Sequence, residues 1–266
     1  MKALFTLTPA ESRRLIAKAV AALPEVRHAK EEGRIIIGGG TTNGYVVEEL
    51  LGVKIDKANY TFGIVSEGMQ CSTSGAKREK PIPYTIVRGE VKTDKPYTDY
   101  LKEFTKDDVM IKGANAVDPE GNAGVLIGSP VGGTIGAVYN TVFPRNSKLI
   151  IAVGLEKLVP SVLDAASYGG LYDWDFCLGM RCALWPVVGA IVITEIEALA
   201  ILAGVDAVHF SSGGVGGSAG AVTLAIEGED ENVREAFELI KSIKGEPPLA
   251  DAKRPCAECE NHCDRF

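Results

Sequence analysis

The sequence predicts an α/β protein built on a mainly parallel sheet. Strands are expected at residues 34–37, 107–111 and 148–153, where each contains a short, continuous apolar run of the kind typical of strands buried on both faces. Segments with helix signals alternate with these runs, and glycine-rich turns separate strand from helix. This alternation favours a parallel sheet whose strands are joined by helical crossovers.

Composition narrows the class of protein. The chain has 266 residues, of which 46% are hydrophobic and 24% charged, and this balance indicates a globular protein. The formal net charge of −7 disfavours nucleic acids and anionic membranes as partners. No apolar run reaches the roughly 18 residues of a membrane span, and the first residues lack a signal-peptide pattern. We therefore expect a cytoplasmic protein.

Local signals place the elements in the first two thirds of the chain. Thr8 can cap a helix that begins at Pro9, Glu11 completes a capping box, and the helix should run to about residue 23. A second helix is expected at residues 41–51, where Gly52 can end it. The remaining strands are expected at residues 60–65, 84–87 and 124–127, and the remaining helices at 99–104, 132–143 and 160–168.

A different order begins near residue 187. Residues 169–186 break the alternation and are interpreted as a connector. The elements expected after it are a strand, a helix, two strands, a helix and an edge strand, at residues 187–193, 194–204, 207–211, 221–228, 230–245 and 246–250. The order βαββαβ predicts a small ferredoxin-like α+β domain. The expected organisation is an α/β ligand-binding domain at 1–186, the ferredoxin-like domain at 187–252 and a cysteine-rich tail at 253–266.

A glycine turn predicts where a ligand binds. Gly38, Gly39 and Gly40 stand between a strand and a helix, so backbone amides should point out of the carboxyl edge of the sheet, where anions bind in open α/β folds. Thr41 and Thr42 add hydroxyl donors. The alternative is a tight turn that binds nothing. A second turn of this kind follows, with Gly132, Gly133 and Thr134, and either faces the same crevice or serves packing alone.

The loop KGANAVDPEGNAG, residues 112–124, should form a neighbouring wall of that crevice. Lys112 can neutralise a phosphate or carboxylate, Asn115 can orient a ligand, and Asp118 can act as a general base. Lys112 and Asp118 are therefore the catalytic candidates. Asp118 to Gly121 also matches an Asp-Pro-Glu-Gly turn, and in that interpretation Asp118 is structural.

Three segments resemble, in order, parts of the ribose-5-phosphate isomerase A and CoA-transferase-like superfold. IIIGGGTTNGYVVEELLG resembles the phosphate loop of the isomerase, and KGANAVDPEGNAG resembles its Asp-Gly-Ala-Asp-Glu loop. SKLIIAVGLEKLVPS is similar to a strand of lactate-utilisation (LUD) domains. The resemblance implies the fold, a ligand crevice, a small anionic metabolite such as a sugar phosphate or a CoA-like nucleotide, and a homo-oligomer.

The departures from the family argue against its best-known reaction. Lys112 and Asn115 stand where the isomerase loop carries two carboxylates, and the helix after the second glycine turn contains no acid. CoA transferases use a glutamate nucleophile, but Glu67 and Glu156 do not lie in the expected motif. The resemblance therefore implies the fold and the crevice without implying the reaction.

The cysteines suggest a second kind of site. Cys256, Cys259 and Cys263 follow the spacing Cys-x2-Cys-x3-Cys, with His262 beside the last, and this density is typical of zinc or an iron–sulfur cluster. A fourth ligand must come from His262, a distant cysteine, a partner chain or an exogenous ligand; the alternative is a flexible tail with incidental cysteines.

The other three cysteines are interpreted differently. Cys177 and Cys182 are expected to be buried thiols, and Cys71 is disfavoured as a nucleophile because no histidine is near it in the sequence. Two functions stay open: a protein that binds a small anion, with or without catalysis, and a metal-binding, redox-linked or ligand-sensing protein.

Overall fold

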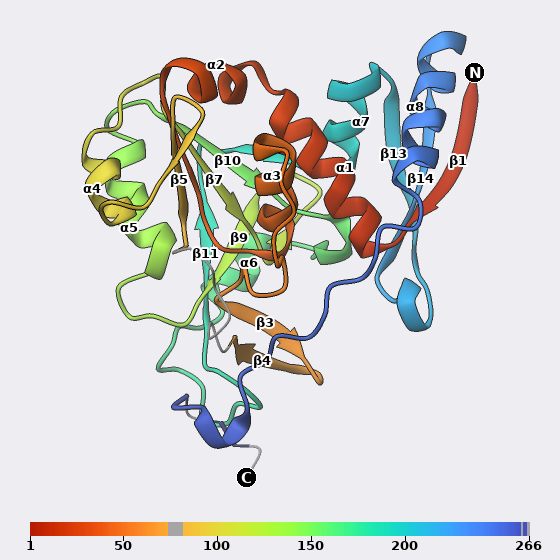
Figure 1. Ribbon diagram of the computed structural model, residues 1–266. Helices are drawn as coiled ribbons and strands as arrows, with labels where there is room; N and C mark the ends of the chain where they lie inside the picture. The colour runs from red at the N-terminus through yellow and green to blue at the C-terminus, as the bar shows by residue number, and fades with distance from the viewer. Residues whose placement is uncertain (74–81, 262, 265–266) are drawn as a thin grey trace.

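The computed structural model describes residues 1–73, 82–261 and 263–264. Its main sheet has six strands (Figure 1), in the order β12 (Ile191–Ile193), β10 (Lys148–Ala152), β7 (Val109–Gly113), β2 (Arg34–Ile37), β5 (Tyr84–Val87) and β6 (Glu90–Lys92). The first four strands run parallel, β5 is antiparallel to β2, and β6 is antiparallel to β5. The prediction of an α/β protein whose sheet contains parallel strands is confirmed.

Helices cover both faces of this sheet. The helices on one face are α1 (Pro9–Ala22), α2 (Pro24–Glu32) and α3 (Thr41–Leu51), and those on the other are α4 (Tyr97–Lys102) and α5 (Gly133–Val142). The central strands are consequently apolar throughout, and Ile36, Ile111 and Ile150 are completely buried. None of the helices in the described part of the chain is long and apolar enough to cross a membrane.

Local capping signals set several boundaries. The Thr8 hydroxyl accepts the N–H of Glu11, and the Glu11 carboxylate accepts the N–H of Thr8 at 2.9 Å, so the predicted capping box is confirmed. Gly52 ends α3 in the left-handed conformation, at φ 66°, as expected from its position. The bounds expected for β2 and α3 are those observed.

A second, antiparallel sheet consists of β8 (Ala116–Val117), β9 (Ala123–Ile127) and β11 (Ala183–Val187), with α6 (Val162–Ser167) against it. We expected β9 to join the parallel sheet, and this is wrong. The tight turn after β8 returns the chain directly, so β9 pairs antiparallel with β8, because a parallel neighbour needs a longer crossover. β11 lies in the expected connector, where no local sequence signal indicates that it pairs with the distant β9.

A third sheet contains β1 (Lys2–Leu7), β14 (Ala221–Glu227) and β13 (Asp206–Gly213), with α7 (Glu195–Ala203) and α8 (Asp230–Ile243) packed on it and the 3₁₀ turn η2 (Gly216–Ser218) between β13 and β14. The expected ferredoxin-like order is not formed. β12, predicted as its first strand, pairs with β10, and residues 246–250 lie outside any strand. The third strand is β1, whose alternating burial suits a sheet with one covered face. Sheet membership therefore crosses the expected boundary at residue 187.

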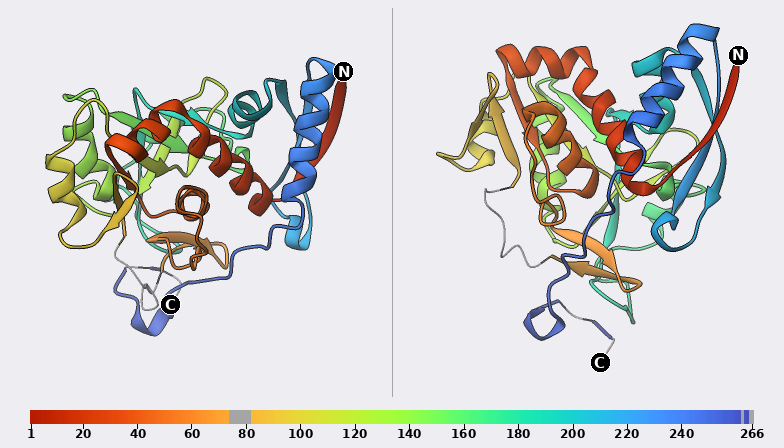
Figure 2. Two further views of the ribbon diagram at one scale, coloured as in Figure 1. Left: turned by 45° about the horizontal axis from the view of Figure 1, so that its top comes forward. Right: turned by 45° about the vertical axis from the view of Figure 1, so that its right-hand side comes forward.

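After α8 the chain crosses the molecule to a separate hairpin, β3 (Gly63–Ser66) and β4 (Met69–Ser72), as Figure 2 shows. Polar contacts hold the segment after α8 along α1. The Gly245 N–H donates to Glu11 at 2.9 Å, and the Arg14 guanidinium binds Glu246 at 2.9 Å. Arg14 also binds Glu48 and Glu49 of α3, so one buried cation joins two helices and the C-terminal segment. This path delivers the last residues to the hairpin.

Candidate metal centre

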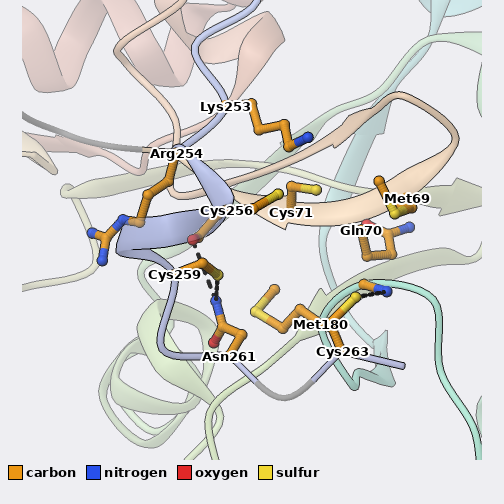
Figure 3. Close-up of a pocket in the computed structure, with 12 residues that line it drawn as sticks. Met69, Gln70, Cys71, Met180, Lys253, Arg254, Cys256, Cys259, Asn261 and Cys263 are labelled. Atoms are coloured by element: carbon orange, nitrogen blue, oxygen red, sulfur yellow. Dashed lines mark hydrogen bonds between the residues drawn. The ribbon is translucent and has the colours of Figure 1, made fainter. Parts of the chain in front are cut away.

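Four cysteines from distant parts of the chain line one cavity of about 210 Å³ (Figure 3). Cys256, Cys259 and Cys263 belong to the tail, where the sequence predicted a metal site. Cys71 comes from β4 of the hairpin, and its role as a nucleophile had been disfavoured. The structure thus brings a fourth thiol to the three expected ones, and no local sequence signal connects it with them.

The hairpin presents Cys71 to the tail. β3 and β4 are joined by the two residues Glu67 and Gly68, with φ values of 51° and 74°. Two positive φ values in succession are those of a type I′ turn, whose twist matches that of paired strands. Cys71 lies opposite Ile64 in the ladder and is half-buried.

Backbone pairing holds the tail on this hairpin. Lys253 forms an antiparallel bridge with Thr73, and the Arg254 N–H donates to the Ser72 carbonyl at 2.9 Å. The Lys253 ammonium binds the Glu67 carboxylate at 2.6 Å. The 3₁₀ turn η3 (Cys256–Glu258) follows, so Cys256 and Cys259 stand one turn apart beside Cys71.

Part of the expected connector closes the site. Gly179 lies beside Gln70 of β4, and a Cβ on Gly179 would be 2.5 Å from the Gln70 carbonyl oxygen. Its φ of +103° also favours glycine. The Gly179 N–H donates to the Cys263 sulfur at 3.0 Å, and the Met180 N–H donates to Gln70 at 2.7 Å. Close backbone approach at Gly179 therefore orients one of the four thiols.

The surroundings act differently on individual thiols. Hydrogen bonds from Asn261, chiefly from its backbone N–H, lower the pKa of Cys259, and the Asn261 side chain lies 3.4 Å from the same sulfur. Burial raises the pKa of Cys71, Lys253 opposes this increase, and the three tail cysteines raise the pKa further. Donors and cations near the sulfurs are the features that stabilise bound thiolate charge.

The spacing of the thiols bears on the kind of metal. Within the described part of the chain, no three His, Cys, Asp or Glu side chains are close enough to hold one metal ion. Zinc with thiolates at about 2.3 Å sets neighbouring sulfurs roughly 3.8 Å apart. The cavity that the four thiols line, about 210 Å³, is larger than one water molecule needs. A cluster, in which sulfide ions separate the metals, spreads its cysteine ligands more widely. His262, the other ligand candidate, lies outside the described residues.

Cys177 and Cys182 do not line the cavity. The Cys182 thiol donates to the Met180 carbonyl at 3.3 Å, and burial raises its pKa to about 11. It therefore stays protonated at neutral pH. Both side chains are half-buried, and the Cys177 N–H donates to the Asp264 carboxylate at 2.6 Å. These two cysteines help to shape the connector.

The glycine turn at the edge of the main sheet is less open than its sequence suggests. The Gly38 N–H donates to Ile111 and the Gly40 N–H donates to Tyr60, both at 2.8 Å, so these two amides are occupied. A Cβ at Gly39 would be 3.0 Å from Phe62, which explains that glycine by packing. α3 nevertheless begins at Thr41 without a side-chain cap. The Thr42 hydroxyl is buried and has no hydrogen-bond partner among the described residues.

The three candidate site residues in and beside the loop after β7 have different environments. Asp118 is buried and its carboxylate accepts the N–H of Asn122 and of Val162, so it holds the turn and the start of α6 and is no longer a catalytic candidate. The exposed Asn115 accepts the N–H of Leu126 with its side-chain oxygen, which ties the β8–β9 hairpin. Lys112 remains available.

The second glycine turn lies elsewhere. It follows β9, which belongs to the antiparallel sheet, so Gly132, Gly133 and Thr134 do not extend from the carboxyl edge of the parallel strands. A Cβ at Gly132 would be 2.9 Å from the Trp185 ring. The packing interpretation of this turn is therefore the one that the structure favours.

Comparison of the chain with protein-family models, with curated proteins and with solved structures finds no match. The resemblance to the isomerase and CoA-transferase-like superfold consequently stays a prediction.

Proposed function

We propose that this is an iron–sulfur protein in which Cys71, Cys256, Cys259 and Cys263 bind a four-iron, four-sulfide cluster. The observation that carries the proposal is the convergence of four thiols, from a hairpin and from the tail, on one cavity. If the six cysteines had no common function, nothing would bring four of them to one cavity while the other two pack in the connector. Four thiols also match the ligand set of such a cluster, with one cysteine for each iron.

Such a cluster would supply one-electron chemistry. Four cysteines provide one ligand for each iron, so no iron is left open to a substrate, and electron transfer is the activity that this ligand set supports best. Within the protein, N–H groups of Gly179 and Asn261 donate to two of the sulfurs. Hydrogen bonds of this kind tune the reduction potential of a cluster.

The direct test is metal analysis of full-length protein purified without oxygen. We expect about four iron atoms and about four acid-labile sulfides per chain, and an electron paramagnetic resonance signal after reduction with dithionite. Stoichiometric zinc without iron, or protein without metal after reconstitution with iron and sulfide, would overturn the proposal.

Cysteine variants test the ligand set. Cys71→Ser should lose most of the iron, because the hairpin thiol is then missing, although the tail motif is intact. Cys182→Ser is the matched control: this half-buried cysteine lies outside the cavity and should retain the iron. Circular dichroism should show that both variants are folded. Full iron content in Cys71→Ser would remove Cys71 from the site.

A second candidate function concerns the carboxyl edge of the main sheet. We propose that a small anionic metabolite, such as a sugar phosphate or a CoA-like nucleotide, binds beside Lys112. Its ammonium forms no hydrogen bond or ion pair with any of the residues that the structure describes, and the uncapped start of α3 favours negative charge. Ribose 5-phosphate and coenzyme A should each be tested for thermal stabilisation of the wild type and of Lys112→Met. Equal stabilisation of both proteins would reject the role of Lys112.

A further inference from the structure

Lys112 occupies an unusual position for a lysine. It is the fourth residue of β7, which lies between the parallel strands β2 and β10, and it pairs with Ile151 of β10. Its stem passes over the glycine turn: a Cβ at Gly38 would be only 2.9 Å from the Lys112 Cδ. Glycine at position 38 therefore leaves room for this side chain, which is partly exposed at the carboxyl edge of the sheet.

Its surroundings hold a second cation and no counter-ion. Lys157, in the 3₁₀ turn η1 (Leu155–Lys157) after β10, donates to the Ala114 carbonyl at 3.0 Å, just beyond the end of β7. Glu156 lies 4.0 Å from the Lys157 ammonium and 3.5 Å from Arg13 of α1. Glu195 of α7 is a further acidic group that acts on Lys157. None of them forms an ion pair with Lys112.

The electrostatic consequence is a lysine that releases its proton easily. Burial by the surrounding strands lowers the pKa of Lys112 to about 8, and the positive charge of Lys157 contributes to the decrease. A lysine that is desolvated beside another cation is one of the arrangements that make an amine nucleophilic at neutral pH. Lysines that serve only as surface charges lack both features.

We propose that Lys112 forms an imine with a small metabolite that carries an aldehyde or ketone group. In this step the Nζ lone pair adds to the carbonyl carbon, and a C=N bond replaces the C=O bond. The carbonyl oxygen leaves as water with the two amine protons, so that no oxidant or reductant is needed. Lys157 is a positioning residue, whose positive charge adds to the effect of burial and increases the neutral fraction of the Lys112 amine.

A neighbouring amide defines the ligand further. The Asn43 side chain is completely buried, and its Nδ2 donates to the Gly38 carbonyl at 2.8 Å, on the turn that Lys112 crosses. Its Oδ1 has no hydrogen-bond partner among the described residues. A hydroxyl group on the ligand would donate the hydrogen bond that this oxygen lacks. The ligand class is therefore a hydroxy-aldehyde or hydroxy-ketone. This inference is independent of the metal centre and narrows the ligand of the second candidate function.

Reductive trapping tests the proposal. Full-length protein is incubated at pH 7.5 with glycolaldehyde and cyanoborohydride, which converts an imine into a stable secondary amine, and adducts are located by peptide mass spectrometry. The exposed Lys106, in the loop before β7, is an internal reference. At pH 7.5 an amine with a pKa near 8 is far more often neutral than an amine with the ordinary lysine pKa. We therefore expect adduct formation on Lys112 to be roughly tenfold faster, or more, than on Lys106. Lys112→Arg should abolish the fast adduct.

The pH profile separates a reactive amine from mere accessibility. Labelling of Lys112 should have its midpoint near pH 8. Lys157→Met should move that midpoint to higher pH, because removal of a neighbouring positive charge favours the protonated amine, and Lys157→Arg should preserve it. Labelling no faster than that of Lys106 would overturn the proposal. If anions stabilise the protein thermally but no adduct forms, imine chemistry is excluded and anion binding stands.

Discussion

Glu195, at the start of α7, is a carboxylic acid with no exposed surface. One carboxyl oxygen accepts the N–H of Leu155 at 2.9 Å, and the other borders Gly154 together with a carboxyl oxygen of Glu156. Burial, and secondarily the charge of Glu156, raise the pKa of Glu195 to about 7. The perturbation that tests this environment is Glu195→Gln, which keeps the shape and removes the ionisation.

The magnitude follows from the shift in pKa. The change from the ordinary value of 4.5 to about 7 corresponds to roughly 3 kcal/mol, at about 1.4 kcal/mol per pKa unit. Between pH 4.5 and 7 the folded state holds a proton that the unfolded state has released, so wild-type stability falls as pH rises through this window. The loss is complete above pH 7. Glu195→Gln does not titrate.

The assay is urea denaturation of the wild type and of Glu195→Gln at pH 4.5, 6 and 8. The difference in free energy of unfolding, variant minus wild type, should grow in favour of the variant by roughly 3 kcal/mol across this range, because all other titrating groups are common to both proteins. The exposed Glu235 of α8 provides the control: Glu235→Gln should show no such trend. A pH-independent difference for Glu195→Gln would refute the reasoning.

Three further predictions concern a cap, a buried cation and a close contact. Thr8→Ala removes half of the capping box and should lower the free energy of unfolding by about 1 kcal/mol in urea titrations; no change would show that the cap is dispensable. Arg14→Met removes one partner of the buried Glu48, which Lys54 and Lys57 still bind, and should lower the free energy of unfolding by roughly 1–3 kcal/mol, measured in the same way, whereas a more stable variant would contradict this account. Gly179→Ala drives a methyl group into the Gln70 backbone and should lower the iron content of anaerobically purified protein. Gly52→Ala, also at a positive φ but with open space around it, should keep its iron at a cost of roughly 1 kcal/mol, and equal iron in both variants would argue against the Gly179 contact.

The elements that were predictable are those whose causes lie in the sequence nearby. The capping box at Thr8, the continuous apolar run of β2 and the terminal Gly52 of α3 each act within a few residues, so pattern and structure agree there. β1 and β11, and the sheet that β9 joins, have causes elsewhere. β1 needs β14 from the other end of the chain, and β11, in a segment without a strand signal of its own, needs β9 from much earlier in the chain.

The candidate sites divide in the same way. The tail spacing indicates three possible ligands because metal sites reuse short intervals between cysteines. Cys71 joins them only because the C-terminal segment, held by Arg14 and then by Thr73, runs back to the hairpin. The turn at Gly38 shows the reverse: its sequence suggests free amides, and tertiary hydrogen bonds to Ile111 and Tyr60 occupy two of them.

By itself, the sequence determined the α/β class, the position of the buried parallel strands and the presence of a cysteine-rich tail, because apolar periodicity, capping and motif spacing are local properties of a chain. Only the tertiary structure decided which strands share a sheet, that Cys71 meets Cys256, Cys259 and Cys263, and that Lys112 lies near Lys157 without a counter-ion. These relations depend on contacts between segments remote in sequence, whose loop-closure cost is repaid by the packing of the whole molecule.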